Sequence, residues 1–546
     1  MSGDQRRSRV GVGTGDSQAE SNLRYRRLRS PVASEQSLQI PPLAQTISSW
    51  NDRIQPSSEI EVGGLELSSL QRLGRSELLD RAMGYSARYR DVDLADRDAQ
   101  SIVMSGHQPL LFHPGVWFKN FALSSVGLAV GATPVNLVVD NDVCGSAAIK
   151  CPAFKDGRAS TGLIDIDAAA AAMPYETRPI VDVELFASFA DRASKSLKDC
   201  LAALRKDAEP LVSSLWPHVL SAKESLGDSA SLGAVLAAGR HRLEQEIGLQ
   251  TLEVPVSTVA QTEAFCHFAA AIMKEQSRFN ASYNARLIEY RQLHRIRSSA
   301  HPVPELEQND GWLESPFWVW RNAQPQRQRL FLKESGGTIT LTDRAGWELV
   351  TKSVSLANTL SEMAGQQIAI RPRALITTLY SRLVLSDLFL HGIGGAKYDQ
   401  LTDLIAIDFF DVALPVFSTL TATMHLPFGH PLVSPHDRSE LRNQIRQRRF
   451  HPERFIDSSD AEDLILRKRT AIENSTMNRF RRHQEIEEAN QSMQPFVADQ
   501  IEGLQQKLFN AVDQIRNSRV LNSREYSFCL FPESLIDDLK QMASPI

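Results

Sequence analysis

The sequence predicts an α/β fold whose Rossmann-like parallel sheet is built from two separate stretches of the chain. Three observations lead to this class. Strand and helix patterns alternate in residues 101–142, and they alternate again in residues 367–423. The stretch between them is mainly helical with one clear β-hairpin, and the residues after 431 show only helical periodicity. We therefore expect each alternating stretch to supply one half of the sheet.

These patterns divide the chain into five regions. The N-terminal region lacks the apolar residues needed for a core, so we expect it to be disordered. Two core halves flank an inserted connecting region, and a highly charged helical region follows. The expected regions are a disordered tail at 1–40, the first half of the core at 60–150, the connecting region at 151–365, the second half of the core at 366–430, and a C-terminal helical, coiled-coil region at 431–546.

The first core half contains the best-marked β-α-β unit in the chain. An apolar strand at 101–105 leads into a loop at 106–115, a helix at 116–130 and a second strand at 134–139. An amphipathic pattern over 65–89 predicts a helix ahead of this unit.

The remaining elements are expected from apolar periodicity and from glycine and proline positions. In the connecting region we expect irregular chain at 144–173, helices over 183–247 with interruptions at 216–217 and 227–231, an edge strand at 252–257, a long helix at 263–297 and a hairpin at 329–342. In the second core half we expect a strand at 367–371, a buried helix at 373–390, a glycine-rich loop at 391–397, a helix that ends near 410, and a strand at 414–423.

The C-terminal region contains a short heptad-like seam. Its apolar residues are spaced by alternating steps of four and three, which is typical of a coiled coil. The seam is under three heptads long, so its role stays undecided between two interpretations. The helix could pack on its own domain, or it could form a hairpin or homodimer contact. The seam residues are Val497, Ile501, Leu504, Leu508, Ala511 and Ile515.

The composition is that of a globular protein, and we expect its partner to be a small-molecule substrate. The chain has 546 residues, 42% of them hydrophobic and 23% charged, and a net charge of −5, which provides no electrostatic case for nucleic acid or an anionic membrane as partner. No apolar run in the sequence is long enough to span a bilayer. The N-terminal region has no apolar segment of the kind found in secretory signals, so we do not expect it to be one. Five cysteines without a C-x-x-C pair indicate the reducing cytoplasm and provide no support for a zinc site.

Two histidines mark the loop after the first core strand. His107 lies between Gly106 and Gln108, and His113 follows six residues later, just before a helix whose free N–H groups favour an anion. Either imidazole could hydrogen-bond a bound anion or donate a proton to a leaving group. The alternative is structural: one histidine caps the loop and the other packs beside aromatic residues.

Acidic residues follow the second core strand. Asp140 and Asp142 flank Asn141 at the carboxyl end of that strand, where open α/β sheets bind their ligands. Such carboxylates can bind Mg²⁺, hold a ribose or orient an amine nucleophile. The alternative is that they cap the next turn.

A second anion site is indicated in the other core half. Gly394 and Gly395 leave backbone N–H groups open, Lys397 adds a mobile positive charge, and Asp399 follows. The spacing is not that of a Walker loop. Two arginines before the preceding helix could extend this pocket or form salt bridges; they are Arg371 and Arg373.

The opening loop resembles a known family. Its Ser-Gly-His-Gln-Pro-x-Leu-Phe sequence, followed by a helix and a strand that ends in acid, is similar to the N-terminal signature of the bacillithiol biosynthesis cysteine-adding enzymes. The coarse layout is similar over most of residues 60–530. The resemblance implies a Rossmann-like core related to class I aminoacyl-tRNA synthetases, inserted connecting domains, and a C-terminal coiled coil used for dimerisation. It also implies a ligase that joins cysteine to glucosaminyl malate.

The resemblance carries over at only some positions of the loop. Gly106, Gln108 and the Leu-Phe pair at 111–112 fit the family pattern, whereas His107 replaces a glutamine and His113 stands where glycine is usual. The acidic turn matches in place and in sign. These departures lie where substrate would bind, so the resemblance implies a changed substrate on a retained fold.

The expected function follows from these sites and the resemblance. We expect a cytoplasmic ligase or transferase that joins a cysteine-like amino acid to an amine-bearing small molecule, with a nucleotide such as ATP or ADP and Mg²⁺ as candidate cofactors and no resident metal. The alternatives are a nucleotide-binding transferase or ligase without thiol chemistry, and a non-catalytic coiled-coil assembly protein.

Overall fold

A computed structural model of the chain describes residues 28–52, 60–92, 98–296, 303–430, 434–457, 459 and 461–544. Residues 1–27 of the predicted N-terminal tail lie outside the described residues.

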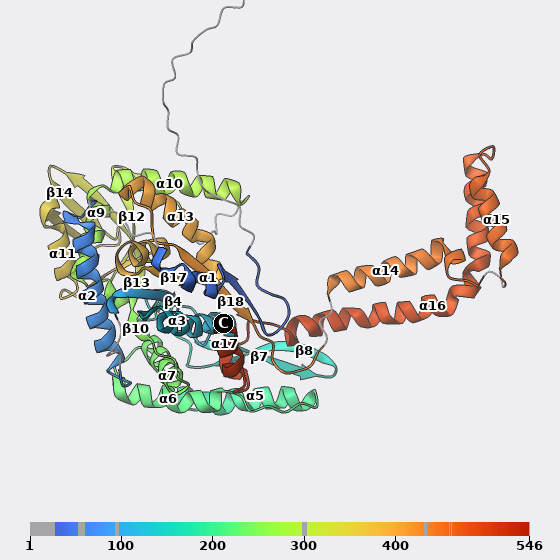
Figure 1. Cartoon of the computed structure of the whole chain (residues 1–546), viewed down its shortest axis with the longest axis horizontal. Helices are drawn as coiled ribbons and strands as arrows, with labels where there is room; N and C mark the ends of the chain where they lie inside the picture. The colour runs from blue at the N-terminus through green and yellow to red at the C-terminus, as the bar shows by residue number, and fades with distance from the viewer. Residues whose placement is uncertain are drawn as a thin grey trace, which may run out of the picture.

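A six-stranded, mostly parallel sheet forms the centre of the protein (Figure 1). Both faces of its central strands are buried, so their sequences are almost continuously apolar, as is typical of parallel sheets. Five strands run parallel, and one edge strand pairs antiparallel. Across the sheet the order is β1 (Gln36–Ile40), β18 (Phe417–Thr423), β17 (Leu388–His391), β4 (Asp98–His107), β5 (Ala132–Val138) and β10 (Leu252–Pro255).

The two crossover helices lie on opposite faces of this sheet. Helix α3 (Pro114–Val130) joins β4 to β5, and its apolar residues share a core cluster with Val103 and Leu390. Helix α13 (Ile393–Phe410) joins β17 to β18 and belongs to the other cluster, which includes Met104. The strands that follow β4 in the chain therefore add to one side of the sheet, and the strand that follows β17 adds to the other side. The predicted α/β class with a parallel sheet is confirmed.

A second, antiparallel sheet is built mainly from the connecting region. Its strands are β11 (Gln308–Asn309), β12 (Trp312–Arg321), β13 (Gln324–Ser335), β14 (Thr338–Thr342) and β15 (Glu348–Lys352), with β16 (Ile368–Pro372) paired to β12. The predicted hairpin at 329–342 is confirmed. The strand expected at 367–371 exists, but it belongs to this sheet and not to the parallel one.

The core strand that the sequence predictions missed is β17. It falls inside the helix expected at 373–390, which is wrong beyond residue 385: α12 (Ala374–Tyr380) continues as a π-helical turn (Ser381–Leu385) and then gives way to the strand. A continuous apolar run fits a buried helix and a buried strand equally well, so periodicity could not separate them. The glycine-rich loop expected at 391–397 is likewise mostly the first turn of α13.

Five further predictions need correction. The strand expected at 252–257 in the connecting region is β10, which joins the parallel sheet beside β5, so this sheet draws on more than the two predicted core halves. Residues 36–40 of the expected tail form the edge strand β1. The supposedly irregular chain at 144–173 contains β6 (Val143–Cys144), β9 (Met173–Pro174) and the hairpin of β7 (Ala148–Lys155) and β8 (Arg158–Asp165). No break occurs at 216–217, because buried packing holds α6 (Val212–Leu226) together through Pro217. The long helix at 263–297 is two helices, α9 (Glu263–Lys274) and α10 (Gln276–Leu293).

The other helices agree better with expectation. The helix expected at 65–89 is α2 (Leu67–Ser86), and the break expected at 227–231 separates α6 from α7 (Leu232–Glu246). The remaining helices of the body are α1 (Leu43–Ser48), α4 (Val183–Ala187), α5 (Phe189–Ala203), α8 (Val256–Val259), α11 (Leu356–Met363) and α17 (Leu535–Ala543).

The C-terminal helices form an arm that extends away from the body (Figure 1). It consists of α14 (Pro435–Phe450), α15 (Glu462–Glu473) and the 43-residue α16 (Arg479–Leu521). The seam residues Val497, Ile501 and Leu504 pack on Ile445 of α14. This part of the seam is therefore a hairpin within the chain, whereas dimerisation stays a prediction. In the part of the chain that the structure describes, no helix combines the length and apolarity needed to cross a bilayer.

Candidate ligand site at the carboxyl edge of the parallel sheet

Polar residues collect where the parallel strands end. Strands β17 and β4 end at His391 and His107, β5 runs into Asp140, and Ser257 lies just beyond β10. The winding direction reverses between β17 and β4, and sheets of this kind bind ligands beside such a reversal. The first turns of α3 and α13 begin at the same edge.

His107 is a packed ring and not a group exposed at the mouth of the sheet. Its Nε2 lies 3.0 Å from Asn120 Oδ1, and its Nδ1 lies 3.1 Å from the backbone oxygen of Gln108. Burial, together with the nearby cations Arg240 and Lys119, lowers the pKa of His107 well below its usual value. This placement corresponds to the structural alternative.

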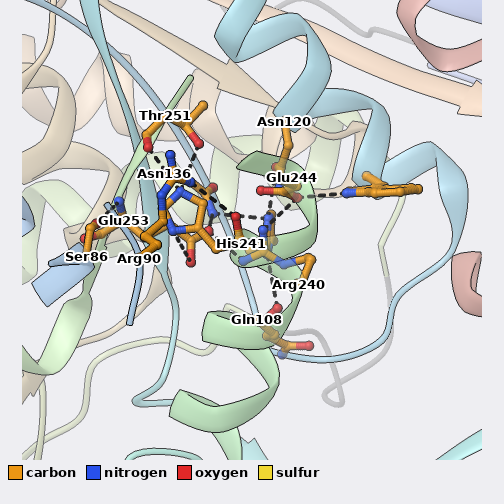
Figure 2. A network of polar contacts seen from close by, with 12 residues as sticks. Ser86, Arg90, Gln108, Asn120, Asn136, Arg240, His241, Glu244, Thr251 and Glu253 are labelled. Carbon is orange, nitrogen blue, oxygen red and sulfur yellow. Dashed lines mark hydrogen bonds and ion pairs between the residues drawn. The ribbon is translucent and has the colours of Figure 1, made fainter. Parts of the chain in front are cut away.

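The network behind His107 is organised by one arginine (Figure 2). Arg240 of α7 is 1% exposed and bonds Glu244 Oε1 at 2.7 Å and Glu253 Oε1 at 2.5 Å. The Glu244 carboxylate also accepts from the Trp117 indole at 2.7 Å, and Glu253 accepts from Asn136 at 2.5 Å. The network thus ties α7 to α3, β5 and β10. Its charges are paired internally, which indicates a structural role.

His113 caps α3. Its Nδ1 accepts a hydrogen bond from the backbone N–H of Gly115 at 3.1 Å, and its Nε2 lies 4.0 Å from Glu525. Burial lowers the pKa of His113 to about 4. The segment after α16 covers this loop, because the N–H of Phe528 donates to the backbone oxygen of Phe112 at 2.8 Å. The N-terminus of α3 is therefore occupied by the protein itself.

Lys119 is a buried cation that no sequence motif marks, because it lies within the apolar run of α3. Its Nζ donates to the backbone oxygen of Gly106 at 2.6 Å. Burial lowers the pKa of Lys119 to about 7. The predicted binding residue Gly106 is thereby fixed at the end of β4.

Asp140 connects β5 to the segment after β10. Its carboxylate accepts from the Ser257 N–H at 2.9 Å and from the Ser257 hydroxyl. Burial, and then the negative charge of Glu176, raises the pKa of Asp140 to about 7. The next residue, Asn141, donates to the backbone oxygen of Pro372 at 2.8 Å. The acidic turn therefore contacts the antiparallel sheet directly.

Asp142, which follows β5, links the end of that strand to the end of β4 at this edge of the sheet. It accepts from the Gln108 amide and, at 3.0 Å, from Arg327 of β13. Two predicted site residues, Gln108 and Asp142, are therefore in contact. Sequence patterns do not point to Arg327, which comes from a strand far away in the chain.

Arg371 and Arg373 form ion pairs instead of lining an open anion pocket. Arg371 bonds both carboxylate oxygens of Glu176, the shortest at 3.0 Å. Arg373 bonds Glu314 at 2.7 Å. Each guanidinium also lies over a tryptophan ring. The Arg371 pair holds the antiparallel sheet against Glu176, whose N–H donates to the backbone oxygen of Asp140, and the Arg373 pair joins β12 to the end of β16 within the sheet. Both arginines correspond to the salt-bridge alternative.

The first turn of α13 differs from that of α3 because no side chain caps it. Gly392 is the N-cap, and a Cβ atom on Gly392 or Gly394 would meet no other atom within 4 Å. Lys397 is half-buried, and its amino group has no hydrogen bond or ion pair with any described residue. An anion could therefore contact backbone N–H groups here with little obstruction.

A buried ion-pair network lies below this turn. Asp399, predicted as an anion-binding residue, instead accepts from His391 Nε2 at 2.9 Å and from Arg382 Nη1 at 2.6 Å. Arg382 also pairs with Asp403 at 2.7 Å and donates to the backbone oxygen of Pro415 at 2.5 Å. His391 was not among the predicted site residues. Its signal is a histidine that ends an apolar run, precedes Gly392 and lies eight residues before the aspartate.

The structure therefore brings the predicted residues to one edge but not into one pocket. Within the described ranges, no group of three or more His, Cys, Asp or Glu side chains is arranged to hold a metal ion. In comparisons with known proteins, no protein-family model and no curated protein sequence matches the chain. The relation to the cysteine-adding enzymes stays a prediction from the opening loop.

Proposed function

We propose that the chain is a Rossmann-like ligase or transferase related to class I synthetases, and that it binds the phosphate groups of a nucleotide at the first turn of α13. The observation that carries the proposal is the uncapped, glycine-rich turn at the point where the strand order reverses. In chain order the parallel strands are arranged 3-2-1-4-5, which is the order of dinucleotide-binding sheets.

The residues of this turn suit a phosphate. The N–H groups of Ile393, Gly394 and Gly395 precede the first residue that can bond back within the helix, and that first bond runs from Ala396 to Gly392. An 18-residue helix contributes partial positive charge at its start. Lys397, one turn further, is placed to add a mobile charge beside the anion.

The reaction class rests on the resemblance of the opening loop. A bound ATP would transfer a phosphoryl group to the carboxylate and leave as ADP, and the amine would then displace phosphate from the acyl carbon and lose a proton as the amide bond forms. All five cysteines are buried, so a thiol in the reaction would belong to the substrate. The substrate pair supported by the resemblance is a cysteine-like amino acid and an amine-bearing small molecule, in the cytoplasm.

Gly394 offers a sharp test because a side chain there meets nothing within 4 Å. A Gly394→Asp variant places a negative charge beside the phosphate but suits the first turn of a helix. Gly394→Asn is the neutral control of nearly equal size. Isothermal titration with ATP, ADP and CTP, each with and without Mg²⁺, measures binding.

We expect ATP affinity to fall by about 100-fold or more in the aspartate variant, because like charges in contact cost several kcal/mol. The asparagine variant should stay within about 10-fold of the wild type, and neither variant should melt below it. Equal affinities in the two variants would place the nucleotide elsewhere. Binding of cysteine and an amine substrate without any nucleotide would favour chemistry without ATP, and no binding of any small molecule would favour an assembly role.

A further inference from the structure

His391 is enclosed on most sides. Its side chain is 5% exposed and lies between the Phe389 ring, at 4.5 Å between centroids, and the Phe417 ring, at 5.2 Å. These contacts fix the plane of the imidazole. The ring can therefore present its two nitrogens in only two directions, one toward Asp399 and the other toward the first turn of α13.

The contact with Asp399 decides which nitrogen carries the proton. Burial raises the pKa of this carboxyl, but the Arg382 guanidinium and the hydrogen bond from His391 outweigh burial and hold the pKa below its usual range. An ionised carboxylate accepts only, so His391 Nε2 must donate. In the neutral ring, the lone pair is then at Nδ1.

His391 Nδ1 faces the proposed phosphate site. It forms no hydrogen bond with any residue in the described part of the chain, and a Cβ atom on Gly395 would lie 2.7 Å from it. Glycine at this position therefore leaves the first turn of α13 open toward Nδ1. An unpartnered nitrogen on a buried ring and an uncapped helix start thus meet at one place.

A lone pair on Nδ1 and a phosphate oxygen cannot share this space without a proton between them. We infer that a phosphate ligand binds at the first turn of α13 together with one proton, which His391 Nδ1 holds and donates to a phosphate oxygen. The inference rests on the proposed phosphate site and adds its proton-holding residue. The proton leaves a buffer acid or hydronium ion of the solvent and forms the Nδ1–H bond, and no other covalent bond forms or breaks.

The charged groups around the ring support this arrangement. Asp399 contacts its Nε2, Arg382 pairs with both Asp399 and Asp403, and Lys397 lies two residues before Asp399 on α13. The Asp399 carboxylate, 2.9 Å from Nε2, can pair with a positive charge on the ring once Nδ1 holds a proton. Phosphate binding should therefore be linked to the uptake of a proton.

Isothermal titration of the full-length protein with ATP at pH 8, in buffers of different ionisation enthalpy, measures the protons taken up on binding. We expect a net uptake of protons on ATP binding in the wild type. His391→Gln should abolish the uptake and weaken ATP by about 10- to 100-fold, the loss expected for one charge-assisted hydrogen bond. His425→Gln, beyond the end of β18 at the same edge, is the matched control and should retain the uptake.

ATP binding without proton uptake in the wild type would overturn the inference and leave the phosphate site intact. Proton uptake that persists in His391→Gln would also overturn it, because another group would then hold the proton. The wild-type measurement stands even if the glutamine variant fails to fold. If ATP does not bind to the wild type, the proposed site fails, and the inference fails with it.

Discussion

Arg240 is the residue whose removal should cost the most stability. It is 1% exposed and forms ion pairs with Glu244 and Glu253, each 0% exposed. Methionine in its place would fill much of the volume of the arginine stem, so the main effect is two buried carboxylates without a cation. Removing one partner of a buried ion pair costs about 3–5 kcal/mol, and we expect a loss of unfolding free energy in that range for Arg240→Met at pH 8.

The loss should depend on pH. Burial already raises the pKa of Glu253 while Arg240 opposes that rise, so the substitution raises this pKa further. The folded variant then binds more protons than its unfolded chain, and its stability falls as the pH rises, by up to about 1.4 kcal/mol per pH unit for each proton. The deficit should therefore be smaller at pH 5.5 than at pH 8.

Urea unfolding followed by tryptophan fluorescence is the appropriate assay, since Trp117 donates to Glu244 and reports on the network directly. Arg467→Met is the matched control: Arg467 pairs with Glu488 on the arm, both are about half exposed, and the loss should be below about 1 kcal/mol. Equal losses in the two variants, or a deficit for Arg240→Met that does not change with pH, would refute the reasoning.

Three further predictions follow. Burial and a neighbouring negative charge raise the pKa of Asp140 to about 7, so the contribution of this carboxyl to wild-type stability falls as the pH rises from about 4 to about 7. The melting temperature of Asp140→Asn relative to wild type should therefore rise from pH 5 to pH 8. A constant difference between the two melting temperatures would contradict this. Gly395→Ala should lower the melting temperature, since its Cβ would lie 2.7 Å from a buried imidazole, whereas Gly394→Ala should leave it unchanged or higher; equal melting temperatures would disprove the clash. Val497→Asp should expose α14 to limited proteolysis, while Phe509→Asp, at a 74% exposed position, should not; identical digestion patterns would mean that the seam is not held by α14.

Much of the fold could be predicted from local pattern because the strands of the first core half carry clear signals. The strand at 101–105, the helix after it and the strand at 134–139 all appear where expected. The second half was harder because β16 and β17 lie close together in the sequence but join different sheets. Strand partners are set by tertiary contacts, which periodicity does not contain.

The site was predicted in place but not in detail. The carboxyl edge of the sheet is fixed by strand direction, so Gln108 and Asp142 could be expected to lie near each other. What each charged side chain does depends on distant partners: Arg371 meets Glu176, and His113 accepts from the turn that it precedes. A sequence shows which residues are polar but not which distant residues they contact. The predictions therefore assigned binding roles to groups that are already paired in the folded protein.

The central claim is that a phosphate binds where α13 begins, and hydrogen–deuterium exchange with and without ATP and Mg²⁺ tests it most directly. Backbone N–H groups that contact a bound phosphate exchange more slowly. We predict protection in peptides that cover residues 388–399, and its loss in Gly394→Asp but not in Gly394→Asn. Saturating ATP binding with protection elsewhere and none at 388–399 would contradict the claim.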